Sequence, residues 1–426
     1  RAKTDGTMKA VKFQINGTPA TPGISALGTT TGGTDLNLTA LAARTGVGQW
    51  QKTVITPLND SYPKSAQRDD CAGSTCTYVE EMENFANWYT YYRTRNQSMK
   101  SAVGKAFSIL NDNYRVGLMG LQVRPNDMSS IDSDFHPVAP FTPNSTHRSA
   151  WYTKLYNINA GSGTPLREAL YSAGIYYEGG STAPADPIEY SCQQNYAFLA
   201  TDGYWNGDYS TWNLIGNTED SSDSGYSKRS DGAYDGGRLN QNAVGGSLAD
   251  VAMHFYKKDM RSGTGAKSLN NVPTTAKDKN TGQHMATYTM GLGVDGLMTY
   301  QKDYETATLG DFNKIRNGDT NCSWEANTTD VCNWPASKHD SQAAVDDLWH
   351  AAVNGRGKYY SAKSPQDAAD GLNDALTQIQ QTTGAAAASA TSSPNITPTD
   401  NSIFSSTYQT VVWDGEVIKQ RIDPSS

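Results

Sequence analysis

Long hydrophobic runs, metal-type histidine spacings and an excess of basic charge are all missing from this chain of 426 residues. No stretch of about 18 consecutive apolar residues occurs, so we expect no membrane-spanning helix. Lysines and arginines number 35 against 43 aspartates and glutamates, and the resulting net charge of −8 argues against a nucleic-acid-binding surface. The six histidines show no spacing such as His-Glu-x-x-His; they are His136, His147, His254, His284, His339 and His350. We interpret His254 and His350, which lie within helical patterns, as packing or surface residues.

Enzyme signatures are absent as well. Ser162 lies outside any Gly-x-Ser-x-Gly frame, and no nucleophile is paired with a base in the sequence. The acidic stretch TEDSSDSGYSKRSDGAYDGG lacks the ligand order and the terminal glutamate of an EF-hand loop, which favours a solvated loop. We therefore expect a protein that binds rather than an enzyme.

Cysteine is scarce, with five residues in the whole chain. No Cys-x-x-Cys pair supplies a zinc spacing. Two close pairs, Cys71 with Cys76 and Cys322 with Cys332, bracket short polar loops, which predicts two short-loop disulfides and an oxidising compartment. Cys192 is left over just before an apolar run, and we interpret it as a buried, reduced thiol.

The order of the apolar runs predicts the fold class. Strand-like runs at 114–123, 196–201 and 286–294 alternate with helical patterns, one of which begins at Glu80. Buried strands that alternate with helices are typical of a doubly wound, mostly parallel α/β sheet. We expect these three runs to share one sheet, with large surface insertions at 124–147 and 206–245. The aromatic cluster NWYTYY on the first helix is interpreted as core packing.

The two ends of the chain lack the alternation of strands and helices that marks this α/β region. Residues 1–79 are rich in turn signals, although AVKFQI alternates as a strand would. We expect the α/β domain at 80–382 and a linker at 383–399, which includes the tract GAAAASATSSP. Residues 400–426 predict the start of a β domain, with a hairpin that turns at WDGE.

Two loops carry candidate metal ligands. The run YAFLATDGYWN ends a buried strand on Asp202, and the turn Gly161–Pro165 places Thr164 before a helix. Ligands of open α/β sheets bind at the carboxyl ends of strands, and hydroxyl and carboxylate oxygens suit Mg²⁺ or Ca²⁺. Each residue also has a structural interpretation, because Thr164 could cap the helix and Asp202 could form a turn before Gly203.

Several blocks of sequence resemble a known family. The chain contains, in this order, ENFANWYTYYRTRNQSMKSAVGKAF, YRVGLM, GTPLREAL, YSCQQNYAFLATDGYWNG, LADVAMHFYKKDMR, HMATYTMGLGVDG and DDLWHAAVNGRGKYYSAK. These blocks, from about Cys71 to the linker, resemble the PilY/PilC family of type IV pilus tip proteins. The resemblance implies an exported protein at the pilus tip or cell surface, with a von Willebrand factor A-like domain followed by a β-propeller. It also implies minor pilins and a surface or host-cell ligand as partners.

The resemblance further implies a metal-dependent adhesion site. Such a site combines an Asp-x-Ser-x-Ser loop, a threonine on a second loop and an aspartate on a third, and Thr164 and Asp202 match the second and third positions. The single literal match to the first motif, Asp220–Ser224, follows Asp202 and has no buried strand before it, so we interpret it as a chance match. We expect the first motif to precede Arg1 and this chain to hold metal weakly or not at all. A metal-free structural brace of the tip and an extracellular metal-dependent hydrolase are the alternatives.

Overall fold

The structure, a computed structural model, describes residues 11–16, 49–64, 68–125, 128, 134–161, 163–179, 185–206, 215, 246–325, 331–383, 385–391, 402–409 and 414–421. Two compact units divide the chain between Thr94 and Arg95, a later boundary than the expected one at residue 80. None of the helices in these ranges is both long enough and apolar enough to cross a bilayer.

Within its described residues, the first unit contains two antiparallel strand pairs and helix α2 (Tyr78–Tyr91). Strand β1 (Val11–Asn16), predicted from AVKFQI, pairs with β2 (Gln49–Val54), and the short β3 (Tyr62–Pro63) pairs with β4 (Thr75–Cys76). Helix α2 begins directly after β4.

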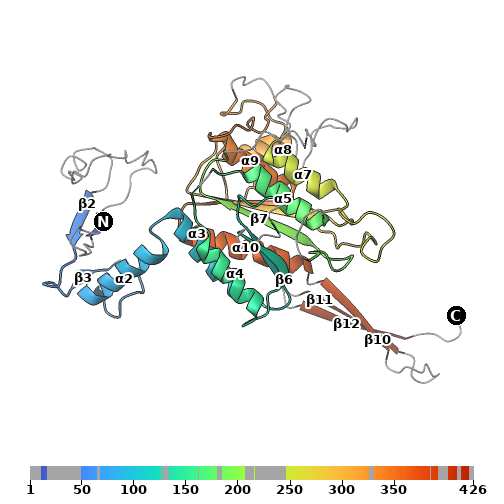
Figure 1. The fold of residues 1–426 in the computed structure, drawn as a ribbon, viewed down its shortest axis with the longest axis horizontal. Coiled ribbons are helices and arrows are strands. Elements are labelled where there is room, and N and C mark those ends of the chain that lie inside the picture. Colours follow the sequence, from blue (N-terminus) through green and yellow to red (C-terminus); the bar gives the residue numbers. More distant parts are fainter. Residues whose placement is uncertain are drawn as a thin grey trace. The chain divides into compact units, whose positions relative to one another are not determined.

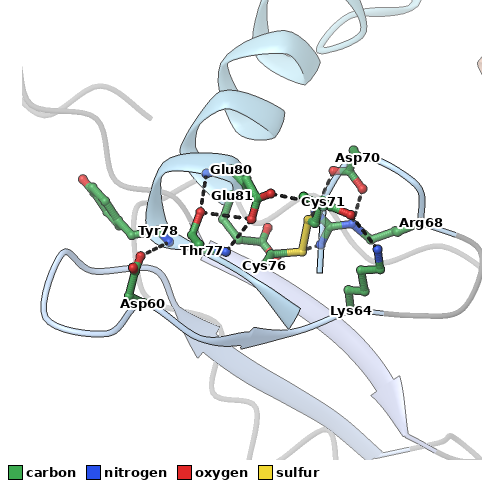
Figure 2. Close-up of a disulfide and its surroundings, with 11 residues drawn as sticks. Asp60, Lys64, Arg68, Asp70, Cys71, Cys76, Thr77, Tyr78, Glu80 and Glu81 are labelled. Atoms are coloured by element: carbon green, nitrogen blue, oxygen red, sulfur yellow. Dashed lines mark hydrogen bonds and ion pairs between the residues drawn. A yellow bond between two sulfur atoms is a disulfide. The ribbon is translucent and has the colours of Figure 1, made fainter. Parts of the chain in front are cut away.

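Helix α2 starts at this point because Thr77 and Glu80 form a capping box (Figure 2). The Glu80 amide donates to the Thr77 hydroxyl at 3.2 Å, and the Thr77 amide donates to Glu80 Oε2 at 2.8 Å. Because these bonds satisfy two amides that no helical carbonyl can reach, they favour a helix start at this residue.

The predicted disulfide between Cys71 and Cys76 is confirmed, and it lies beside this cap (Figure 2). Arg68 bridges Asp70 and the buried Glu81, at 2.6 and 2.8 Å, while Lys64 donates to the Cys71 carbonyl oxygen. The disulfide, Ile55 and Tyr62 make a small core under the first turns of α2. The end of this helix is more exposed. Trp88, Tyr91 and Tyr92 are 49%, 51% and 39% accessible, so the expectation that NWYTYY packs in a core is wrong for these three side chains.

The second unit contains a parallel sheet of three strands in the order β7 (Asn195–Thr201), β8 (Met285–Leu292) and β9 (Arg356–Ala362). Helices cover both faces of this sheet, which confirms the predicted α/β class (Figure 1). On one face lie α5 (Leu166–Glu178), α7 (Leu248–Lys257) and α9 (Ala343–Asn354). On the other lie α3 (Arg95–Phe107) and α10 (Pro365–Thr383).

Alternation along β8 explains why this strand is buried throughout. Tyr288, Met290 and Leu292 pack toward α3 and α10. On the opposite face, Met285 packs with α7 and α9, and the Thr289 hydroxyl donates to the Leu348 carbonyl oxygen at 2.7 Å. Successive side chains of a strand point to opposite faces, so a strand covered on both faces needs apolar residues at nearly every position.

The expectation that 114–123 shares this sheet is wrong. Strand β5 (Arg115–Met119) instead pairs antiparallel with β6 (Phe135–Pro140), in a separate two-stranded sheet. Strand β6 comes from the segment 124–147 that we expected to lie on the surface, yet Phe135 and Phe141 are buried. The two prolines of FHPVAP hid this strand, because proline is depleted from strand interiors and tolerated at sheet edges. Helix α4 (Thr146–Asn157), capped by Ser145, follows β6.

The remaining cysteines give one confirmation and one correction. Helix α8 (Asp311–Asn317) leads into the predicted disulfide between Cys322 and Cys332, which is present. Cys192 is free, as expected, but exposed rather than buried. It lies in the turn before β7 begins at Asn195, so the apolar character of the strand does not extend to it.

The C-terminal segment forms an antiparallel sheet of β10 (Ala385–Thr391), β11 (Ser402–Gln409) and β12 (Asp414–Arg421). The alanine tract expected to be a linker therefore contains a strand, whose backbone is paired along β11. The predicted hairpin is present, but WDGE is not its turn, because Asp414–Glu416 already pair with β11.

Candidate functional site

Asp202 lies at the carboxyl end of β7, where the strand gives way to a turn. The turn itself is made by the buried Thr201, whose hydroxyl accepts from the Gly203 amide at 3.2 Å. The Asp202 side chain is exposed. The hydroxyl of Thr201 thus takes the turn-forming role that we had weighed for Asp202, and the Asp202 carboxylate faces solvent.

Thr164 precedes α5, and its hydroxyl does not cap that helix. The N-cap position belongs to Pro165, and no side chain caps the helix there. The first amide, that of Leu166, donates instead to the Thr164 backbone carbonyl oxygen at 2.9 Å. The capping interpretation of Thr164 is therefore wrong.

Asn206 joins the Thr164 loop to the loop after β7. The backbone amide of Thr164 donates to the side-chain oxygen Oδ1 of Asn206 at 2.9 Å. In return, the backbone amide of Asn206 donates to the Thr164 carbonyl oxygen, also at 2.9 Å. The side chain of Asn206 also donates through Nδ2 to Asp340 Oδ1 at 2.7 Å. The structure thus brings together the two loops that the sequence singled out, and adds a third, the loop before α9.

Two further side chains hold the backbone of these loops. Arg95, the first residue of α3, donates through Nη1 to the Asp202 carbonyl oxygen at 2.8 Å. Gln122, after β5, donates to the Gly163 carbonyl oxygen at 2.8 Å. Gly293 follows β8 with a φ of 69°, and a Cβ at this position would lie 3.5 Å from Arg95 Nε. Glycine suits this position because of the left-handed backbone, since a Cβ at that distance would make only an ordinary contact with Arg95.

The side chain of Trp205 attaches the same loop to α9 and α5. Its indole nitrogen donates to Asp347 Oδ2 at 3.2 Å, and the guanidinium of Arg167 lies 4.2 Å from its ring centre. The Asp347 carboxylate also accepts the Leu248 and Ala249 amides at the start of α7, at 3.0 and 3.1 Å. Burial raises the pKa of Asp347 to about 6, and the bonds from these two amides oppose that rise.

Sequence reasoning missed Arg95, Asn206, Asp340 and Asp347. Asn206 follows the singled-out Asp202 by four positions, so its place in the same loop was a usable signal. The other three are distant in sequence, and only the fold brings them to this edge. Asp220–Ser224 and Ser162 lie outside the described residues.

The two candidate ligands supply one hydroxyl, from Thr164, and one carboxylate, from Asp202. Both are hard donors of the kind that Mg²⁺ takes along with several waters. Across the described ranges, no three His, Cys, Asp or Glu side chains gather into a metal-binding cluster. Two such donors would leave most of the coordination shell of an ion to water or to other ligands.

Comparisons with known proteins identify relatives of this chain. No family profile matches it, and no solved structure does. Three curated proteins named type IV pilus biogenesis factor PilY1, from Pseudomonas aeruginosa, do match. The protein from strain PAK is 31% identical over 325 residues, or 70% of this chain and 26% of its own length. That from strain PAO1 is 31% identical over 344 residues, or 74% and 28%. That from strain UCBPP-PA14 is 28% identical over 393 residues, or 85% and 32%.

This chain thus spans about a quarter to a third of the length of these relatives. The alignments cover most of the chain, and the resemblance inferred from the sequence blocks is confirmed. Over this aligned part, the chain belongs to the PilY/PilC family of type IV pilus biogenesis factors.

Proposed function

We propose that this chain is part of an exported type IV pilus biogenesis factor, and that its α/β unit binds a ligand at the carboxyl edge of the parallel sheet. The observation that carries the proposal is the joining of two loops at this edge. Asn206 links the Thr164 loop to the loop after β7, and the Asp202 carboxylate faces solvent. Open α/β sheets bind ligands at this edge. The names of the relatives support the pilus role.

We further propose that the unit is an A-type domain, completed in the longer protein by one more strand. Strands β5 and β7 each pair on one edge only within the described residues. Both are apolar yet only partly buried, as expected of strands that lack a neighbour. Val103 and Phe107 of α3 pack against the core of β8 and β9 and also against that of β5, so one helix covers both sheets. A strand between β5 and β7 would carry the Asp-x-Ser-x-Ser loop to the same edge.

In this proposal Thr164 and Asp202 are the second-loop and third-loop ligands of a Mg²⁺-type ion. One coordination position stays open for a carboxylate of a partner, so the edge acts as a receptor and not as a catalyst. Minor pilins and a surface or host-cell ligand are the partners that we propose for the whole protein.

Calorimetry with Mn²⁺ on the longer protein tests the metal site. We expect Asp202→Ala and Thr164→Val each to weaken binding by about tenfold or more, because each removes one of few protein ligands. Circular dichroism and the melting temperature should stay unchanged, since Asp202 is exposed. Asp112→Ala is the control, because Asp112 is also an exposed acid but lies in the turn before β5, away from the carboxyl edge.

If Asp202→Ala binds Mn²⁺ as tightly as the wild type, Asp202 is not a metal ligand. If the longer wild-type protein binds no metal at all, the metal-free brace becomes the better function. Arg95, Gln122 and Asn206 already hold these loops by direct hydrogen bonds, which is the observation that favours the brace.

A further inference from the structure

Asn206 is the residue at which three loops of the carboxyl edge meet. It is bonded twice to Thr164, before α5, and once to Asp340, before α9, while it belongs itself to the loop after β7. We propose that Asn206 is the positioning residue of the site, which sets the place of Thr164 relative to Asp202 through its bond to Asp340. This inference rests on the proposed function, because it assigns the control of that same edge.

Asparagine suits this position because its amide carries both an acceptor and a donor. The acceptor end, Oδ1, must face the Thr164 amide, and the donor end, Nδ2, must face the Asp340 carboxylate. An aspartate in its place would still accept from Thr164 but would set two carboxylates against each other. The bonds from Asn206 and His339 hold the pKa of Asp340 below its usual range, so Asp340 is charged at neutral pH.

Asp340 is itself held in place, which lets it act as a fixed reference for Asn206. Its φ of 53° lies in the left-handed region, which aspartate and asparagine adopt more readily than other residues apart from glycine. Its amide donates to the Trp205 carbonyl oxygen at 3.1 Å, and Trp205 is anchored on the buried Asp347. These two bonds fix the loop before α9 relative to the loop that carries Asn206.

The test exchanges the side-chain donor of Asn206 and the acceptor of Asp340 by swapping the two residue types. In the longer protein, Asn206→Asp should weaken Mn²⁺ binding by about tenfold, the scale of effects from residues that support metal ligands. The Thr164 amide should also exchange faster with solvent, because its acceptor is pushed away. The double variant Asn206→Asp/Asp340→Asn should restore both values, since the donor then lies on the Asp340 side.

A matched control is Asn317→Asp on α8, an exposed asparagine whose side chain donates to Asn313 Oδ1 at 2.8 Å. We expect this control to change neither value. Melting temperatures of all variants should agree, which separates a positioning effect from loss of the fold.

Unchanged exchange of the Thr164 amide in Asn206→Asp would overturn the inference, and so would a double variant that restores nothing. The exchange rate is measured without metal. It therefore tests the positioning role even if the wild-type protein binds no ion, in which case the proposed metal site fails by itself.

Discussion

At the scale of single residues, the two buried aspartates Asp346 and Asp347 hold loops in place through hydrogen bonds. Asp347 accepts hydrogen bonds from Trp205 and from two amides of α7, so one carboxylate connects α9, α7 and the loop that follows Asp202. Asp346, its neighbour on α9, accepts the Leu297 and Met298 amides after β8. Neither acid stood out in the sequence, because a carboxylate inside a helix is usually solvated.

These two acids predict an unusual pH dependence of stability. Burial raises the pKa of Asp347 to about 6 and that of Asp346 to about 7, from an ordinary 3.8. The folded state therefore binds these protons more tightly than the unfolded state does. Their contribution to stability is complete below pH 4 and is lost as the pH rises through about 7, about 3 kcal/mol for Asp347 and about 4 kcal/mol for Asp346.

Urea unfolding between pH 4 and pH 7 measures this effect. Asp347→Asn should be less stable at every pH, because its amide nitrogen would face backbone donors. It should also lose less stability over this pH range than the wild type, since only Asp346 still titrates. Identical slopes for the two proteins would show that Asp347 is ionised throughout.

At the scale of elements, helices that cross at close range decide the packing above the parallel sheet. Gly174 of α5 lies against the ring of Phe255 of α7, and a Cβ at this position would meet the ring at 2.3 Å. The ring of Phe255 belongs to the core between α5, α7 and α9, which is closely packed.

We expect Gly174→Ala to destabilise the protein although alanine favours a helix. The gain in helix propensity is about 1 kcal/mol, but overpacking of a full core costs about 1–3 kcal/mol or more. A lower melting temperature measures the net loss. Gly265→Ala is the control, since the nearest atom to its Cβ would be 3.7 Å away. Equal melting temperatures for the two variants would mean that Phe255 moves aside freely.

At the scale of the whole molecule, the pairing of the cysteines is typical of a protein that folds in an oxidising compartment. Two disulfides, one in each unit, close short loops, and the remaining cysteine is exposed. This pattern agrees with export, because structural disulfides persist in oxidising compartments.

Labelling of the native protein tests this arrangement. A maleimide should modify Cys192 alone without denaturant, because only this thiol is free and exposed. Peptide mass spectrometry without reduction should then find Cys71 linked to Cys76 and Cys322 linked to Cys332. A linkage that involves Cys192, or a native protein that takes up no label, would contradict the structure.

Most of the elements in the α/β region could be predicted from the sequence. The apolar runs that became β7 and β8, the helix that starts at Leu166 and the two disulfides all follow from local patterns of hydrophobicity and spacing. The aspartate at the end of β7 was visible for the same reason, because a buried strand that stops at an acid and a glycine is a local signal.

Only the tertiary structure decided which strands share a sheet and which side chains complete the site. Strand β5 pairs with β6. This pairing was not predicted, because the two prolines of β6 hid that strand in the sequence. Asn206 and Asp340 meet across a separation of 134 residues, and Asp347 reaches Trp205 across 142. Hydrophobic periodicity reports the burial of each segment by itself. Hydrogen bonds between distant loops depend on how the segments are arranged in space, and no local pattern encodes that arrangement.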